Sequence, residues 1–292
     1  MFDKEQKVIF ADSCKDNPNI DPERLKGLIT NKTKVIVPVH YAGVACDMDR
    51  IMDIANRHNL FVVEDAAQAI DSYYKGKPLG TIGHFGCFSF HETKNVTSGG
   101  EGGLLSVNDE AYLRRAEIIW EKGTNRAEVF SVVWLTNMVG SIQDQVFYHR
   151  KLIVPFFVGS NLRAWIKFKI DAKRCWGAYY EGLKDLADKG FFSLPDIPEY
   201  ATNNAHMFYL VCRSLDERTK LISYLKDKDV NAVFHYLSLH LSDYYKDHHE
   251  GIIPNLPNCD RFADCLVRLP MFYELKDEEV QIVVDAIKEY FL

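Results

Sequence analysis

Three short, almost wholly apolar runs constrain the fold of this 292-residue chain most strongly, and they cover residues 7–13, 34–40 and 60–65. A strand that is buried on both faces reads as such a continuous apolar run, which is typical of parallel sheets covered by helices. Between the second and third runs, residues 47–59 carry apolar side chains at helical spacing. This alternation of strand and helix predicts an α/β layer with a mostly parallel sheet.

The pattern of elements changes after about residue 176, where a smaller α+β domain is expected. In the first part, Asp21 and Pro22 have the positions of a helix N-cap and first helical residue. A further strand is expected at 87–90, and a helix at 109–123 ends at Gly123. The second part is expected to contain helices at 176–190, 217–230 and 277–292 and apolar, strand-like segments at 207–215 and 231–237.

Charge and composition exclude several classes of function. The net charge of −6 gives no basic field for nucleic acid or an anionic membrane. The seven cysteines are odd in number and form no CxxC pair, which argues against zinc and dithiol redox sites and favours reduced thiols in a cytoplasmic protein. The N-terminus has no apolar signal region, and the most apolar run, 152–159, is too short to span a bilayer.

Three polar residues follow predicted strands, at the sheet edge where ligands of parallel sheets bind. They are His40, Asp65 and Lys94, the last in the glycine-rich segment FSFHETKNVTSGGEGG at 88–103. Each residue alone has an ordinary interpretation, as a structural histidine, a turn-forming aspartate and a surface lysine. Together they form a set that suits chemistry on an aldehyde cofactor.

Such chemistry needs a lysine in its free-amine form, because only the uncharged amine forms a covalent imine bond with an aldehyde. The ordinary pKa of lysine is about 10.4, and burial favours the neutral form. In pyridoxal phosphate enzymes an acidic side chain keeps the pyridine nitrogen protonated, so that the ring acts as an electron sink. Lys94 and Asp65 have the residue types for these two roles.

Three motifs carry a resemblance to a known family: VVEDAAQA at 62–69, GCFSFHETKN at 86–95 and GGEGGLLSVND at 99–109. They resemble the DegT/DnrJ/EryC1/StrS sugar aminotransferases, which are pyridoxal-phosphate-dependent enzymes of fold type I. The resemblance is closest to the dTDP-4-amino-4,6-dideoxygalactose transaminases of enterobacterial common antigen synthesis. It covers roughly residues 7–130 and 176–292, and it implies a cytoplasmic homodimer that binds neither nucleic acid nor membrane.

The resemblance implies a role for each residue that matches the family motifs around the cofactor. Lys94 is expected to bind pyridoxal 5'-phosphate covalently and to move the proton during transamination. Asp65 is expected to pair with the pyridine nitrogen, Gln68 to lie beside the 3-oxygen of the ring, and Ser89 to contact the phosphate. Gln68 as a polar residue at a helix start and Ser89 as a core hydroxyl are the alternative, purely structural interpretations.

Substrate contacts are implied for four further residues: His40 near cofactor or substrate, and His206, His235 and Tyr236 where the smaller domain closes on a sugar nucleotide. The expected reaction moves an amino group from glutamate to a dTDP-4-keto-6-deoxy-hexose. Relatives with histidine at the position of Lys94 act as dehydratases, so the lysine favours transamination. His235 and Tyr236 as members of a half-exposed strand remain the structural alternative.

The chain departs from the family pattern in two places. The resemblance implies that residues 1–130 are a large domain lacking its first helices, its first strands and a phosphate-binding turn, with an uncovered sheet face and an open edge. Residues 131–175 resemble nothing in the family, and a hypothesis is that they are a frame-shifted translation; residues 176–292 form the small domain. The alternatives to an active enzyme are a non-catalytic remnant and a cofactor-binding module without turnover.

Overall fold

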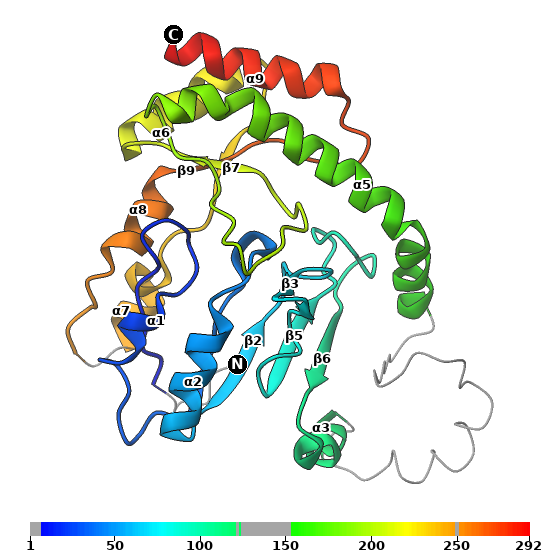
Figure 1. Cartoon of the computed structure of the whole chain (residues 1–292), viewed down its shortest axis with the longest axis vertical. Helices are drawn as coiled ribbons and strands as arrows, with labels where there is room; N and C mark the ends of the chain where they lie inside the picture. Colours follow the sequence, from blue (N-terminus) through cyan, green and yellow to red (C-terminus); the bar gives the residue numbers. More distant parts are fainter. Residues whose placement is uncertain (1–6, 121–122, 124–152, 249–250) are drawn as a thin grey trace.

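A mixed four-stranded sheet organises the first half of the chain (Figure 1). The computed structural model describes residues 7–120, 123, 153–248 and 251–292. The sheet has the order β1-β2-β5-β6. Its first three strands are parallel, and β6 runs antiparallel to β5. The strands are β1 (Val35–Ile36), β2 (Phe61–Asp65), β5 (Phe85–Ser89) and β6 (Gly103–Val107).

The N-cap expected at Asp21 is confirmed, and the helix expected at 109–123 is observed as a 3₁₀ turn followed by a shorter α-helix. In α1 (Pro22–Leu25) the Asp21 side chain accepts a hydrogen bond from the Glu23 N–H. Helix α2 (Met48–His58) is capped by Asp47 and ends at Asn59, which is left-handed with φ 52°. Helix α3 (Leu113–Trp120) follows a 3₁₀ turn at Glu110–Tyr112. A hairpin, β3 (Tyr73–Tyr74) and β4 (Lys77–Pro78), lies between β2 and β5.

The core of this half lies between α2 and the sheet. Met48, Ile51 and Ala55 on one face of α2 are fully buried, together with Val62 of β2. Their spacing of three and four residues places them on a single helix face, as the 47–59 pattern predicted. The α/β expectation for this half is therefore confirmed, with an antiparallel β6 as an addition.

The second half forms a smaller α+β domain, as expected. Its sheet has the order β7-β9-β8 and is antiparallel throughout. The strands are β7 (Tyr209–Val211), β8 (Val233–Phe234) and β9 (Leu266–Arg268). The helices are α6 (Leu215–Asp227), α7 (Asp243–His248), α8 (Pro257–Cys265) and α9 (Asp277–Phe291), with a 3₁₀ turn at Leu239–Leu241.

Helix α5 (Ile153–Asp188) joins the two halves and is much longer than the helix predicted at 176–190. Its 36 residues extend about 54 Å at the usual helical rise. Cys175, Tyr179 and Leu183 lie in the core of the small domain, where α5 packs against α9. Nearer its start, Trp165 packs against Phe90 and Val96 of the large domain. Figure 1 shows α5 running from α6 and α9 down the side of the molecule.

The segment 131–175, for which a frame shift was hypothesised, lies only partly within the described residues. Residues 131–152 are outside them, and residues 153–175 belong to α5. The predicted helix start at 176 is wrong, because α5 already begins at Ile153 and continues through residue 176 without a break. No helix in the described part of the chain is both long and apolar enough to cross a bilayer.

The strand expected at 7–13 is also wrong. The segment makes a single isolated bridge between Ser13 and Ile20, without a ladder of its own. Its backbone groups are used locally instead, because the Asp21 N–H bonds to the Asp12 carbonyl and the Cys14 N–H to the Asn19 carbonyl. An apolar run becomes a strand only where a neighbouring strand is available to pair with it.

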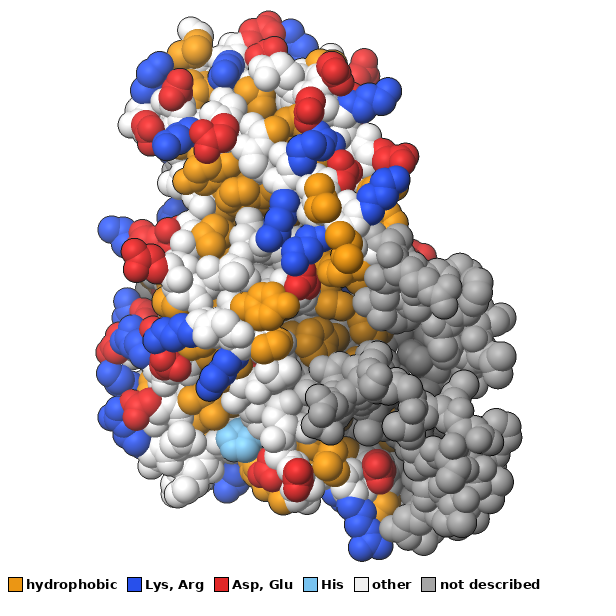
Figure 2. Space-filling view, turned by 45° about the vertical axis from the view of Figure 1, so that its right-hand side comes forward, with side chains coloured by type: hydrophobic (Ala, Val, Ile, Leu, Met, Phe, Trp, Pro, Cys, Tyr) orange, Lys and Arg blue, Asp and Glu red, His pale blue; other side chains and the backbone are white. Residues whose placement is uncertain are grey.

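Strand β1 leaves one face of the sheet exposed at its edge. Val35, Val37 and Val39 have 43%, 53% and 44% of their surface accessible, whereas Ile36 between them is buried. Such alternation is typical of a chain segment with one face packed on the core and the other face open. Figure 2 shows hydrophobic side chains gathered in the middle of one face of the molecule, while charged side chains are scattered over its upper part.

Candidate active site

The carboxyl ends of β2 and β5 bring Asp65 and Lys94 into electrostatic contact. Asp65 is the last residue of β2, and its Oδ1 accepts a hydrogen bond of 3.0 Å from the Ala67 N–H. Lys94 follows β5 by five residues, in a turn closed by a 2.9 Å bond from its N–H to the His91 carbonyl. The parallel pairing places Asp65 opposite Cys87, two residues before the end of β5.

The pKa of Lys94 is lower than that of an ordinary lysine. Burial is the largest cause, Asp65 opposes it by favouring the charged ammonium, and the guanidinium of Arg268 lowers the pKa further. A larger fraction of the Lys94 side chain is therefore the uncharged amine near neutral pH than for a solvated lysine. This is the form that can attack a carbonyl carbon.

Gln68 and Ser89 lie at the same edge of the sheet. The Gln68 Oε1 accepts a 2.7 Å bond from the Ala42 N–H, which leaves its amide NH₂ group without a hydrogen bond among the described residues. Ser89, the last residue of β5, accepts a 3.3 Å bond from the His91 N–H on its Oγ. Both side chains are partly exposed and have capacity for a ligand.

His40 is placed differently from the expectation that it contacts cofactor or substrate. Its side chain is fully buried. Its Nε2 lies 2.9 Å from the Glu64 carboxylate, and its Nδ1 accepts a bond of 3.1 Å from the Cys46 N–H. Because both ring nitrogens are used inside the protein, His40 has no group left for a ligand. We correct its role to a structural one.

Glu64 is the charged centre of that buried cluster. Its oxygens accept hydrogen bonds from the N–H groups of Gly80, Ile82 and Gly83 at 2.6–2.8 Å. Burial by itself would raise the pKa of Glu64, but His40 and these backbone donors outweigh it, and the pKa is lower than usual. Neighbouring residues on a strand point to opposite faces of the sheet. Glu64 therefore holds β2 against residues 80–83 on one face, while Asp65 faces the site on the other.

Asn204 connects the small domain to this edge of the sheet. Its buried amide donates to the Gln68 and Ile70 carbonyls at 2.8 and 2.9 Å and accepts from the His206 N–H at 3.0 Å. Gly43 packs so closely against it that a Cβ at Gly43 would lie 2.0 Å from the Asn204 Oδ1. At its φ of +77° Gly43 also adopts a conformation that favours glycine.

His206 faces the lysine segment from the small domain. Its Nδ1 lies 2.7 Å from the Oδ1 of Asn95, the residue after Lys94. Burial lowers the pKa of His206 to about 3, with contributions from Lys94, Arg268 and His235. His206 is therefore uncharged at neutral pH, and its predicted contact with the substrate remains a proposal.

His235 is held by a tyrosine that the sequence did not single out. The Tyr41 hydroxyl bonds to the His235 Nδ1, and burial raises the pKa of Tyr41. Burial lowers the pKa of His235 to about 4, and Arg268 and Lys94 lower it further. The Tyr236 ring is tilted against the His235 ring, with 4.0 Å between the ring centroids, and Tyr236 is 70% exposed. Its predicted substrate contact remains a proposal.

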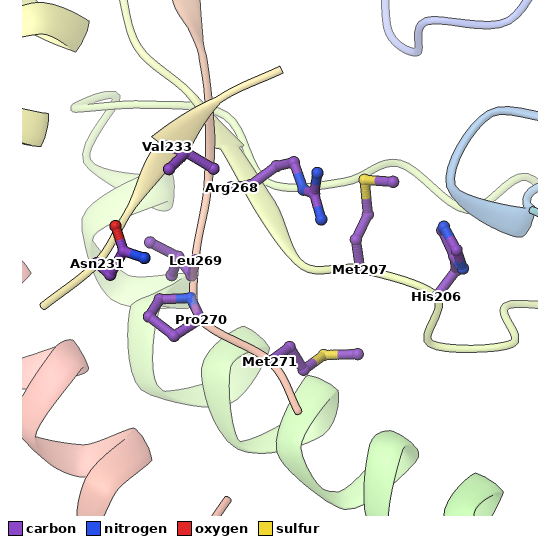
Figure 3. Close-up of a pocket in the computed structure, with 8 residues that line it drawn as sticks. All are labelled: His206, Met207, Asn231, Val233, Arg268, Leu269, Pro270 and Met271. Atoms are coloured by element: carbon purple, nitrogen blue, oxygen red, sulfur yellow. The ribbon is translucent and has the colours of Figure 1, made fainter. Parts of the chain in front are cut away.

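A pocket of about 140 Å³ is lined by residues that precede β7, by the start of β8 and by the end of β9 with the residues that follow it (Figure 3). His206, Met207 and Arg268 are on one side of it and Pro270 and Met271 on another. Arg268 is the second site residue that sequence reasoning missed. A signal was present, because Arg268 interrupts the otherwise apolar run CLVRLPMF at 265–272. Arg268 is partly exposed at the end of β9, and its buried Nε makes no hydrogen bond with the described residues.

The low pKa of His235 predicts a loss of stability in acid. In the unfolded chain His235 is protonated below its ordinary pKa of 6.5, whereas in the folded protein it is protonated only below about pH 4. Protonation therefore favours the unfolded chain, and the folded state loses stability as the pH falls from 6.5 to 4. We expect His235→Gln to reduce the slope of unfolding free energy against pH by up to about 1.4 kcal/mol per pH unit. Urea titrations at about pH 5 and about pH 6 measure the slope; equal slopes in both proteins would refute the assignment.

Comparison with known proteins places this site in a family. The family model described as DegT/DnrJ/EryC1/StrS aminotransferase matches residues 3–288. This chain belongs to that family. It is 32% identical to the pleiotropic regulatory protein of Geobacillus stearothermophilus, over 98% of this chain and 73% of that protein.

Two further members relate the family to its chemistry. The UDP-4-amino-4-deoxy-L-arabinose–oxoglutarate aminotransferase of Shewanella sediminis is 30% identical, over 97% of this chain and 74% of that protein. The X-ray structure of the aminotransferase from Psychrobacter cryohalolentis superposes with a TM-score of 0.83 at 27% identity, over 97% and 75% of the two chains.

Membership defines the cofactor and the fold. Family members are aminotransferases of fold type I that use pyridoxal 5'-phosphate. The residues of this chain fit that cofactor, because a desolvated amine at Lys94 lies within electrostatic range of a carboxylate at Asp65. The donor set therefore has one group for the aldehyde carbon and one for a protonated ring nitrogen.

Proposed function

We propose that this chain transfers an amino group from glutamate to the keto carbon of a dTDP-4-keto-6-deoxy-hexose. The observation that carries the proposal is Lys94, an amine of lowered pKa that faces Asp65 at the carboxyl edge of the sheet. The relative from Shewanella sediminis, whose name pairs a 4-amino sugar nucleotide with oxoglutarate, supports a nucleotide sugar and a dicarboxylate donor. The motif resemblance supports the finer choice of a dTDP sugar.

The residues of the chain divide the work between binding and proton transfer. Bound pyridoxal phosphate supplies the electron sink. Asp65 would keep the ring nitrogen protonated, and the free NH₂ group of Gln68 would bind the ring at its 3-oxygen. Ser89 would donate its hydroxyl hydrogen to the phosphate. Lys94 would hold the cofactor covalently, and its free amine would take the proton from the α-carbon of the amino donor.

The small domain closes the site over the substrate. His206 and His235 are neutral at working pH, because burial and the nearby cations keep them unprotonated. They therefore add no positive charge beside Lys94. Their buried rings limit the access of water to the lysine. Exposed Tyr236 is at the rim, where we place the sugar. We also infer a homodimeric, cytoplasmic enzyme of cell-surface polysaccharide synthesis, in agreement with the resemblance of its motifs.

Borohydride trapping tests this function directly. The purified chain is incubated with pyridoxal phosphate, reduced and mapped by mass spectrometry. We expect the label at Lys94 and a visible absorption band that is absent from Lys94→Ala. Addition of glutamate before reduction should release 2-oxoglutarate, and addition of the keto sugar nucleotide should complete the cycle.

Two outcomes would contradict the proposal in different ways. Label at Lys94 without release of 2-oxoglutarate would identify a cofactor-binding module without turnover. Label spread over exposed lysines, with the same pattern in Lys94→Ala, would identify a non-catalytic remnant. Lys75→Ala is the matched control, because Lys75 is an exposed lysine that pairs with Asp49 on the surface.

A further inference from the structure

A histidine, a cysteine and an aspartate meet where the 3₁₀ turn at Leu239–Leu241 faces the first turn of α8. His240 is the middle residue of the 3₁₀ turn, and Cys259 and Asp260 are the third and fourth residues of α8. One ligand atom of each residue, a ring nitrogen, the sulfur and a carboxylate oxygen, lies within 4.8 Å of the other two. None of these three side chains has a part in the amino transfer proposed above.

The ring of His240 is buried, yet one of its nitrogens has no hydrogen bond. Only 1% of His240 is exposed, and its Nε2 has no hydrogen-bond partner among the described residues. This nitrogen lies 3.4 Å from the Asp260 Oδ1, which is long for a hydrogen bond and outside its geometry. Because buried polar groups are normally satisfied, a further partner is expected between the two side chains.

The separation of these two atoms fits a tetrahedral zinc ion. Zinc bonds to histidine nitrogen and aspartate oxygen are about 2.0–2.2 Å long, which places two such ligand atoms roughly 3.3–3.6 Å apart in a tetrahedron. The distance of 3.4 Å between His240 and Asp260 is within this range. Zinc accepts nitrogen, sulfur and oxygen ligands together, whereas magnesium and calcium prefer oxygen alone.

A zinc ion would also balance the charges of the cluster. A thiolate at Cys259 and a carboxylate at Asp260 together carry the same charge as one zinc ion, with opposite sign. On binding, the Cys259 thiol releases its proton to solvent, and His240 uses the lone pair of Nε2 with the ring hydrogen on Nδ1. The Asp260 side chain is 32% exposed, so an ion can reach the cluster from solvent.

Other side chains hold the three ligands in place. The Ser238 hydroxyl donates a 2.8 Å bond to the Asp260 Oδ1 and lies 3.8 Å from the Cys259 Sγ. The buried Asp12 carboxylate accepts a 2.9 Å bond from the Cys259 N–H and thereby holds the start of α8. In Figure 1 the blue N-terminal segment that contains Asp12 passes beside α8. Such outer contacts orient the ligands of metal sites.

We propose that His240, Cys259 and Asp260 bind a zinc ion that links the 3₁₀ turn to α8. Three protein ligands leave the fourth tetrahedral position for a water molecule. Cysteine spacing did not predict the site, because its ligands come from two separate segments and not from a CxxC pair. The inference is independent of the proposed function, because no ligand takes part in amino transfer.

Zinc and cobalt titrations of the full-length chain, without added pyridoxal phosphate, test this inference. Elemental analysis after gel filtration counts the bound zinc. Cobalt replaces zinc as a probe, because a thiolate ligand gives it a charge-transfer band in the near ultraviolet. The variants are Cys259→Ala, Asp260→Asn and Ser238→Ala. The matched controls are Cys14→Ala, at another partly buried thiol, and Asp264→Asn, at an exposed aspartate of the same helix.

We expect one zinc ion per wild-type chain, a cobalt–thiolate band, and a melting temperature that rises when zinc is added. Loss of an outer partner in Ser238→Ala should weaken zinc binding about 10-fold. Loss of a ligand in Cys259→Ala or Asp260→Asn should weaken it at least about 100-fold, and Cys259→Ala should lack the cobalt band. Both control variants should bind zinc like the wild type.

Two results would overturn the inference. Absence of zinc binding to the wild-type chain would leave His240 and Asp260 as a structural pair, and equal binding to Cys259→Ala would show that zinc binds adventitiously elsewhere. Should Cys259→Ala not fold, as judged by circular dichroism, the cobalt band of the wild type and its weakening in Ser238→Ala still decide the matter. Borohydride labelling of Lys94 tests the enzyme separately, so either assignment can fail while the other stands.

Discussion

Replacement of Glu64 with alanine should lower the free energy of unfolding by about 3–5 kcal/mol. Glu64 has no exposed surface and accepts hydrogen bonds from three backbone N–H groups, and its carboxylate lies 2.9 Å from His40. The variant leaves all of these donors buried without an acceptor. Each unsatisfied donor costs roughly 1–3 kcal/mol before the loss of packing is counted. Urea unfolding near neutral pH measures the difference.

Glu23→Ala is the matched control for this experiment. Glu23 is an exposed glutamate that pairs with Lys26 and Arg50, and such surface pairs contribute about 0–1 kcal/mol. Glu64→Gln keeps the shape and one accepting oxygen, so we expect an intermediate loss. A loss of less than about 1 kcal/mol in Glu64→Ala would show that the cluster is not the structural centre described above.

Replacement of Lys94 with alanine should reduce the rate of amino transfer by at least about 10³-fold, because one residue is both the nucleophile and the proton carrier. Lys94→Arg should be equally impaired, since a guanidinium keeps the charge but offers no free amine at neutral pH. The measurement is single-turnover release of 2-oxoglutarate from glutamate at saturating pyridoxal phosphate.

Lys75→Ala should retain the wild-type rate in the same assay. Unfolding in urea should show that Lys94→Ala is as stable as the wild type, because Lys94 is only half-buried and its side chain forms no hydrogen bond in the described residues. A Lys94→Ala rate within about tenfold of the wild type would be incompatible with a covalent role for this lysine.

The sequence predicted the elements whose signals are local. The α2 helix could be read from its apolar spacing, and the strand ends carrying Asp65 and Lys94 from the apolar runs before them. The 7–13 run failed because pairing is not encoded within a segment. The early start of α5 could not be predicted, because Pro155 and Gly159 near its beginning are poor helix formers.

The site could be predicted where the residue type itself indicates a chemical role. It could not be predicted where the role of a residue depends on its burial in the fold. His40 and His206 look alike in sequence, yet His40 is locked between Glu64 and the Cys46 N–H while His206 faces the lysine segment. Glu64 and Arg268 each interrupt an apolar strand, which is the signal that could have identified them. Tyr41 carries no such signal, because its partner His235 is distant in sequence and meets it only in the fold.

Helix α5 also has a consequence for how the protein opens. Trp165 packs on Phe90 and Val96, which flank Lys94 in sequence, and ten residues later Cys175 enters the small-domain core. One continuous helix therefore contributes to both cores, and the lysine segment cannot be released without disturbing the small domain. We therefore expect the amide hydrogens of residues 90–98 to exchange with solvent in the same cooperative opening as those of β7 and β9. A substitution that leaves a cavity at Leu183, in the small-domain core, should then accelerate exchange beside Lys94.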